Sequence, residues 1–209
     1  NGIEGAGLVL DVSNDESVAS TLEHIQQHLG QPLILVNNAG ITRDNLMLRM
    51  KDDEWFDVID TNLNSLYRLS KAVLRGMTKA RFGRIINIGS VVGAMGNAGQ
   101  VNYAAAKAGL EGFGRALARE VGSRAITVNS VALGAVSHEG IKDGPLNINA
   151  TVENNELLKK MLNVYPISKG VGRLSRPSDI SGVVAFLASE QALFVTGQTL
   201  GASGGFVMN

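Results

Sequence analysis

The sequence predicts an α/β fold built on a doubly wound parallel sheet with helices on both faces. Short apolar runs without inside–outside alternation, of which Leu33–Val36 is the clearest, are typical of strands buried on both faces. Longer stretches with apolar residues at helical spacing separate these runs. With 209 residues, 44% of them hydrophobic, the chain fits one domain with a sizeable core. The expected architecture is therefore Rossmann-like.

The first elements are expected to be a strand end and a capped helix. Leu8–Leu10 is the strand end. Ser13 and Glu16 have the three-residue spacing of a capping box, with Ser13 as the N-cap, and Gly30 ends the helix. The apolar face of this helix is formed by Val18, Leu22, Ile25 and Leu29.

The rest of the chain continues the alternation. Strands are expected at residues 33–36, 84–88, 125–131 and 197–200, and helices at about 54–79, 103–121, 156–162 and 178–188. Ligands of such sheets bind beyond the carboxyl ends of the strands. Small residues collect there, in Asn37–Gly40, Gly89–Ser90 and Ala132–Gly134, and they let a flat ligand approach the backbone.

Composition and charge exclude several classes. Lys+Arg and Asp+Glu both number 19, so no basic excess points to nucleic acid or to anionic lipid. No apolar run is long enough to cross a membrane, and Asn1–Gly5 does not read as a signal peptide. The chain has no cysteine, which fits a cytoplasmic location. No metal site is predicted, because His24 and His28, four apart, lack a third ligand.

One helix start carries the strongest chemical signal. Tyr103 and Lys107 lie four residues apart, so they share a helix face. A neighbouring ammonium lowers the pKa of a phenol, which would make Tyr103 a proton donor to a carbonyl oxygen. Ser90, at a strand end, could hydrogen-bond the same oxygen, and Asn62 could hold a proton-relaying water. The alternative is a solvated helix pair worth about 0.2–0.5 kcal/mol.

These residues resemble the pattern of the short-chain dehydrogenase/reductase family: N-A-G, Asn, Ser and Y-x-x-x-K. Their flanks are similar to bacterial 3-oxoacyl-[acyl-carrier-protein] reductases. The stretches that carry this likeness are Asn37–Asp44, Thr61–Leu63, Ile88–Ser90 and Asn102–Gly109. The resemblance is strong from Gly5 to about Val131, and it resumes at Gly172–Leu174 and runs to the end.

The resemblance implies a catalytic tetrad of Asn62, Ser90, Tyr103 and Lys107. It implies reduction of a ketone, first of all a 3-oxoacyl thioester of fatty acid biosynthesis, with NADP(H) favoured over NAD(H). The partners implied are a small-molecule or acyl-thioester substrate, acyl carrier protein and further copies of the chain in a homotetramer. A secondary-alcohol or small-ketone dehydrogenase is the alternative.

The resemblance also implies the cofactor contacts. Asp11 and Val12 would border the adenine, although Asp11 could equally be a cap between the strand end and the first helix. Asn38, Ala39 and Gly40 would line the adenosine ribose and the diphosphate. The nicotinamide side would be formed by Ile88, Tyr103, Lys107, Gly134 and Val136.

The sequence departs from the family in two places. It contains no T-G-x-x-x-G-x-G loop, so the domain is expected to be N-terminally incomplete, without its first βαβ unit and with an unpaired apolar sheet edge. A fragment or a non-catalytic subunit is therefore a competing hypothesis.

The second departure is residues 133–174, the expected substrate lid. Leu133–Gly134 replaces the family's Pro-Gly, and His138 stands where a Thr often contacts the nicotinamide. Gly140–Asn149 is unlike the acyl-carrier-protein reductases. The sequence reads as a reductase body joined to the lid of another family member.

Overall fold

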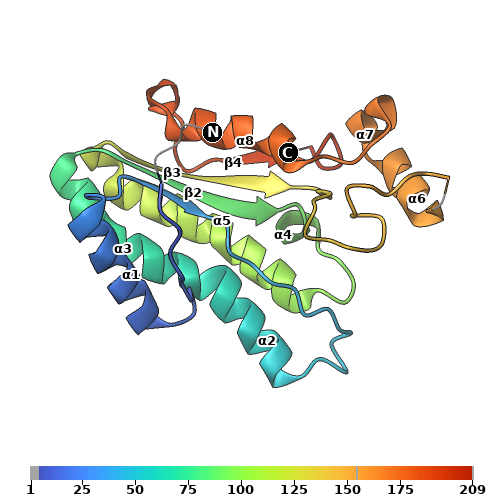
Figure 1. Cartoon of the computed structure of the whole chain (residues 1–209), viewed down its shortest axis with the longest axis horizontal. Coiled ribbons are helices and arrows are strands. Elements are labelled where there is room, and N and C mark those ends of the chain that lie inside the picture. The colour runs from blue at the N-terminus through green and yellow to red at the C-terminus, as the bar shows by residue number, and fades with distance from the viewer. Residues whose placement is uncertain (1–4, 154, 209) are drawn as a thin grey trace.

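The computed structural model describes residues 5–153 and 155–208, and a four-stranded parallel sheet forms its centre. The strands are β1 (Ile34–Asn37), β2 (Gly83–Ser90), β3 (Ile126–Leu133) and β4 (Thr199–Ala202), and they lie side by side in chain order. All three pairs are parallel. The carboxyl ends of the strands therefore meet at one edge, to which the arrows of Figure 1 point. The predicted α/β fold is confirmed.

Helices cover both faces of the sheet (Figure 1). On one face, α3 (Ser65–Ala80) packs on β1 and β2, and α5 (Val101–Val121) packs on β2 and β3. On the other face, α8 (Pro177–Ala188) packs on β2 and β3. α1 (Asp15–His28) packs on α3, away from the sheet, and α2 (Asp52–Ile59) packs on the start of α5.

Buried apolar side chains fill both faces. The cluster between the sheet and α3 and α5 contains Val73, Met77, Ile85, Leu117, Ala118, Val121, Ile126 and Val128. The cluster under α8 contains Ile86, Val131, Ile180, Leu187 and Ala192. Since β2 contributes to both clusters, it is buried on both faces, as is typical of a central strand in a parallel sheet. The apolar run Leu33–Val36, which predicted burial on both faces for β1, is covered on one face only.

The start of the chain differs from the sequence-based expectation. Leu8–Leu10 is not a strand: Val9 is 97% exposed, and the segment has no strand neighbour among the described residues. The N-cap of α1 is Asn14 rather than Ser13, and its side chain accepts from the Ser17 N–H at 2.8 Å. The Ser13 hydroxyl instead donates to the Asp11 carboxylate at 2.6 Å.

Three other boundaries move for backbone reasons. The expected helix 54–79 runs from α2 to α3 through a π-helical turn, Asp60–Asn64. Ala125 has φ 57°, in the left-handed region, so β3 begins one residue later. Gly197 has φ 69°, so β4 starts at Thr199 rather than at residue 197.

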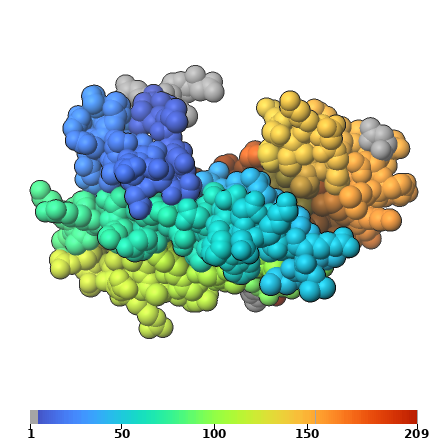
Figure 2. All heavy atoms as spheres, turned by 90° about the horizontal axis from the view of Figure 1, so that it is seen from below, coloured from blue at the N-terminus to red at the C-terminus, as the bar shows by residue number. Residues whose placement is uncertain are grey.

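The segment predicted as a lid carries two helices, α6 (Glu156–Val164) and α7 (Pro166–Val171). It has a small apolar cluster of its own, formed by Leu158, Leu162, Tyr165 and Leu174. In Figure 2 this part, gold to orange, lies across a hollow from the blue N-terminal part.

The side of β1 away from α3 is uncovered. Leu33 and Leu35 pack against the core under α3, whereas Ile34 and Val36 point the other way and are 47% and 42% exposed. In the described part of the chain β1 pairs with β2 alone. The expected unpaired apolar edge is therefore present. No helix of the described residues is long and apolar enough to span a membrane.

Candidate functional site

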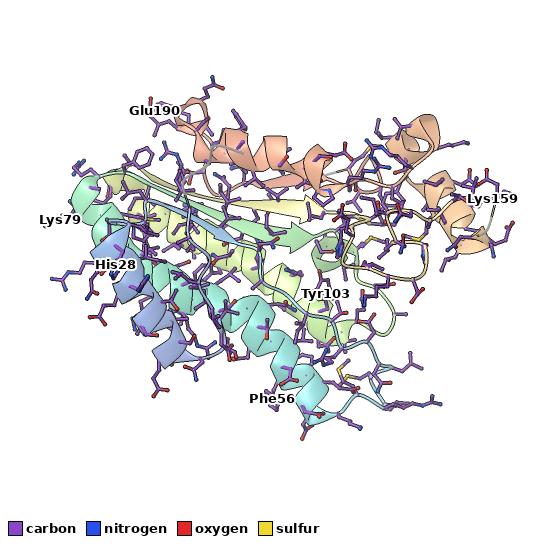
Figure 3. The ribbon with its side chains drawn as sticks, viewed as in Figure 1. His28, Phe56, Lys79, Tyr103, Lys159 and Glu190 are labelled. Atoms are coloured by element: carbon purple, nitrogen blue, oxygen red, sulfur yellow. The ribbon has the colours of Figure 1, made fainter. Side chains whose placement is uncertain are left out.

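Three of the predicted site residues meet at the carboxyl edge of the sheet. Ser90 ends β2, and Tyr103 lies in the first turn of α5, at the end of the molecule to which the strands point (Figure 3). The Ser90 and Tyr103 side chains form a hydrogen bond. Lys107 lies one helical turn further, with Nζ 5.5 Å from the centre of the Tyr103 ring.

Lys107 is a buried amine. Its side chain is 5% exposed, and Nζ donates to the Ile88 carbonyl at 2.8 Å. Because burial penalises the charged form, the pKa of Lys107 falls to about 8. The amine can therefore change its charge near neutral pH.

The pKa of Tyr103 does not follow the sequence-based expectation. Burial raises the pKa, the hydrogen bond from Ser90 lowers it, and the negative charge of Asp44 raises it again, with a net rise. The predicted lowering by Lys107 is therefore wrong for the protein without ligand. The Lys107 amine donates its hydrogen bond to the Ile88 carbonyl. The same kind of burial that raises the pKa of the phenol lowers the pKa of this amine.

Asn62 is fully buried in the π-helical turn, a kind of distortion often found at functional sites. Its Oδ1 accepts from the Ile41 N–H and its Nδ2 donates to the Ile41 carbonyl, both at 2.8 Å. Gly40 lies between Asn62 and Lys107: a Cβ there would come 2.7 Å from Asn62 Oδ1 and 3.8 Å from Lys107 Nζ. The structure thus brings the fourth predicted residue beside the other three.

The residues predicted to contact the diphosphate and the nicotinamide lie along the same edge. Asn38, Ala39 and Gly40 follow β1 and are exposed, and Gly134 and Val136 follow β3. Exposed backbone without a Cβ at Gly40, beside the Asn62 amide and the Lys107 amine, fits the ribose and diphosphate of a nicotinamide nucleotide. The residues present fit that half of the cofactor.

Asp11 lies elsewhere and has a local partner. Its exposed carboxylate accepts from the Ser13 N–H at 2.9 Å and from the Ser13 hydroxyl, and these bonds hold its pKa below the usual value. This geometry fits the alternative reading of Asp11 as a cap. Val12, next to it, is half-buried. The adenine contact of both residues stays a prediction.

The segment after β3 is braced by residues that sequence reasoning did not single out. The Ser175 hydroxyl donates to the Ala135 carbonyl at 2.7 Å. The backbone carbonyl of Ser175 accepts from the Ser137 N–H at 2.8 Å. The ring of Tyr165 stacks on Phe206 and lies against Gly134, where a Cβ would come within 2.8 Å of it. None of these positions belongs to the motifs that carry the family resemblance, so no pattern in the sequence indicated them.

The lid segment forms most of the wall of an open cavity of about 390 Å³. Its lining includes Ser137, Asn149 and Leu158, together with the arginines Arg173 and Arg176. His138, predicted near the nicotinamide, accepts the Gly140 N–H through Nδ1 at 3.1 Å. Elsewhere, His24 and His28 stack with ring centres 4.2 Å apart, and the described residues contain no group of three candidate metal ligands.

Comparison with known proteins places this edge in context. Residues 2–207 match the family model described as enoyl-(acyl carrier protein) reductase. The whole chain is 68% identical to 3-oxoacyl-[acyl-carrier-protein] reductase FabG of Pseudomonas aeruginosa and spans 79% of that protein. Over 207 residues, 99% of this chain, it is 53% identical to FabG of Vibrio harveyi and 52% identical to FabG of Escherichia coli K12, spanning 80% of each.

Proposed function

We propose that this chain, which belongs to the short-chain dehydrogenase/reductase family, reduces a 3-oxoacyl thioester to the corresponding 3-hydroxyacyl thioester with a nicotinamide cofactor. The observation that carries the proposal is the grouping of Ser90, Tyr103 and Lys107 at the carboxyl edge of the sheet. A phenol, a hydroxyl and a buried amine are the groups that proton transfer to a carbonyl oxygen requires.

Each side chain has a distinct role in this reaction. The nicotinamide, when bound, supplies hydride to the carbonyl carbon. Tyr103 donates its phenolic proton to the carbonyl oxygen, and the Ser90 hydroxyl orients that oxygen. Lys107, whose pKa of about 8 lets it exchange protons near neutral pH, resupplies Tyr103. Asn62 positions the water that feeds Lys107.

The same chain provides the cofactor contacts. Lys107 and Tyr103 bind the nicotinamide ribose, while Ile88, Gly134 and Val136 flank the ring. Asn38, Ala39 and Gly40 line the path of the diphosphate, with Asp11 and Val12 at the adenine. We favour NADP(H) over NAD(H) because the motifs of this chain resemble those of bacterial 3-oxoacyl-[acyl-carrier-protein] reductases, a resemblance that implies this cofactor.

The substrate follows from the same likeness. The relatives are named for 3-oxoacyl groups on acyl carrier protein, so acyl carrier protein is the proposed partner. Residues 133–174 form the substrate lid, because this segment begins at the end of β3, at the carboxyl edge of the sheet. A homotetramer in the cytoplasm completes the proposal. A smaller ketone is the alternative substrate, since this lid is unlike that of the acyl-carrier-protein reductases.

Direct titration of the purified 209-residue chain with NADPH, followed by nucleotide fluorescence, tests the cofactor. Saturable binding is expected, with weaker binding of NADH. No binding would favour the second candidate, a non-catalytic subunit. The uncovered apolar side of β1 favours that candidate, since an intact partner chain could cover it.

Tyr103→Phe tests the chemistry. The variant loses the transferable proton and keeps the ring, so ketone reduction should fall by at least about 100-fold. NADPH affinity should stay within about two-fold of the original. Tyr67→Phe, an exposed tyrosine on α3, is the matched control and should keep full turnover. Retained turnover in Tyr103→Phe would refute the assigned proton donor.

A further inference from the structure

We infer that Asn102 is a positioning residue, which fixes the backbone of Tyr103 by joining the start of α5 to the loop after β1 and to α2. This inference rests on the proposed role of Tyr103 as proton donor. It concerns a side chain that is fully buried and lies directly before Tyr103 in the chain.

The first contact of Asn102 is with Tyr103 itself. Backbone N–H groups in the first turn of a helix have no partner within the helix. The N–H of Tyr103 is one of these, and it donates to Asn102 Oδ1 at 2.8 Å. The residue before the helix, Gln100, turns its amide instead to the Asp44 carboxylate, 3.0 Å from each oxygen. Asn102 therefore satisfies the N–H of Tyr103.

The amide nitrogen of Asn102 reaches two other segments. It donates to the Arg43 carbonyl, in the loop after β1, at 3.0 Å, and to the Glu54 carbonyl, in α2, at 2.9 Å. The contacts fix the amide's orientation, because two carbonyls face the nitrogen and an N–H faces the oxygen. Asn102 is fully buried, and Tyr103 and Glu54 are partly buried, so losing the bonds to Tyr103 and Glu54 would leave polar groups unsatisfied.

The loop that Asn102 holds is the loop that Asn62 holds. Asn62 forms two hydrogen bonds with Ile41, and the Asn45 N–H donates to the Gly99 carbonyl at 2.9 Å. The loop is therefore fastened at 41, 43 and 45. Two buried asparagines, Asn62 and Asn102, therefore bond to the same loop. Through Asn102, the backbone of Tyr103 is fixed relative to that loop.

The consequence for chemistry is geometric. The Tyr103 phenol must meet both Ser90 and the carbonyl oxygen of the substrate, and a misplacement of about 1 Å can lower a rate about 100-fold. Because Tyr103 lies in the first turn of α5, its position depends on how that turn is fastened. Asn102 touches no reacting atom, and its effect passes through the backbone of Tyr103.

Asn102→Ser and Asn102→Asp are the test variants. Serine loses the amide donors and most of the reach, and aspartate keeps the oxygen for Tyr103 N–H but cannot donate to Arg43 and Glu54. Asn64→Ala is the matched control, since this exposed asparagine donates to Asp60 on the surface of the π-helical turn. We expect kcat to fall about 10- to 100-fold in both test variants, with KM for NADPH within about two-fold.

Two measurements need no turnover. The chain has three tyrosines, so the ring-carbon NMR signal of Tyr103 can be identified with Tyr103→Phe and titrated in each variant. A change in the titration midpoint of Tyr103 is expected in the Asn102 variants and absent in Asn64→Ala. Amide hydrogen exchange in the original protein should show Tyr103 N–H protected, although it lies in the first helical turn.

The outcomes separate this inference from the proposed function. Full turnover in Tyr103→Phe would refute the function, while the amide exchange and the titration would still decide the role of Asn102. If the variants do not fold, the exchange rate of Tyr103 N–H in the original protein decides alone. An unprotected Tyr103 amide, or an unchanged kcat and titration in folded Asn102 variants, would overturn the inference.

Discussion

Burial of Lys107 makes the free energy of unfolding depend on pH. In the folded protein its pKa is about 8, against a usual 10.5, because the amine is removed from water. This difference corresponds to roughly 3 kcal/mol by which the charged amine opposes folding. In the folded protein, Nζ donates to the Ile88 carbonyl in place of water.

Lys107→Met should remove this penalty. Between pH 8 and 10.5 the unfolded chain holds more protons at this position than the folded chain. The free energy of unfolding of the original protein should therefore rise with pH across this window, whereas that of Lys107→Met should not. Urea unfolding at pH 7, 8, 9 and 10 measures the difference. Parallel pH profiles for the two proteins would contradict the burial of a charged amine.

The sequence indicates a role for Asn62 but not for Asn102. Asn62 belongs to a family pattern and stands in a helix, where asparagine is unfavourable, so it drew attention. Asn102 stands beside Tyr103 with no spacing signal of its own. Its function arises from carbonyls of residues 43 and 54, whose approach depends on how distant segments pack. No local pattern contains that information.

Among the elements, the turn between α5 and β3 is built on a strained residue. Ala125 has φ 57°, and the short 3-10 segment Gly122–Arg124 leads into it. The buried Arg84 of β2 lies near this turn, with Nη1 3.4 Å from the Ala125 carbonyl. Sequence reasoning took residue 125 as the first of the strand, because nothing local marks an alanine as left-handed.

Ala125→Gly should stabilise the protein. A non-glycine residue in the left-handed region costs about 1 kcal/mol relative to glycine, which exceeds the added flexibility of the unfolded chain. The midpoint of thermal unfolding should therefore rise by about 1–2 °C. Ala116→Gly, an exposed alanine within α5, is the control with the opposite sign, because glycine weakens a helix interior. A lower midpoint for Ala125→Gly would contradict the strain.

For the molecule as a whole, the uncovered side of β1 is the main liability. Ile34 and Val36 point away from the core, and a strand with a free edge offers unpaired backbone groups to other chains. Self-association of the isolated chain is therefore expected.

Val36→Lys should reduce that association. The substitution places a charge on the exposed apolar side, and its effect on the free energy of unfolding should stay within about 0.5 kcal/mol. Sedimentation velocity over a concentration series measures the association. Leu35→Lys, on the same strand but facing the core, is the control and should unfold the protein. Undiminished association of Val36→Lys would show that another surface is responsible.

The sequence by itself determined the class of fold, the order of most helices and strands, and the residues that meet at the carboxyl edge, because periodicity and short motifs are local properties. The tertiary structure alone decided that Leu8–Leu10 is not a strand, that Asn14 rather than Ser13 caps α1, and that Lys107 bonds a carbonyl. These outcomes depend on which distant groups are present to pair, cover or desolvate a side chain.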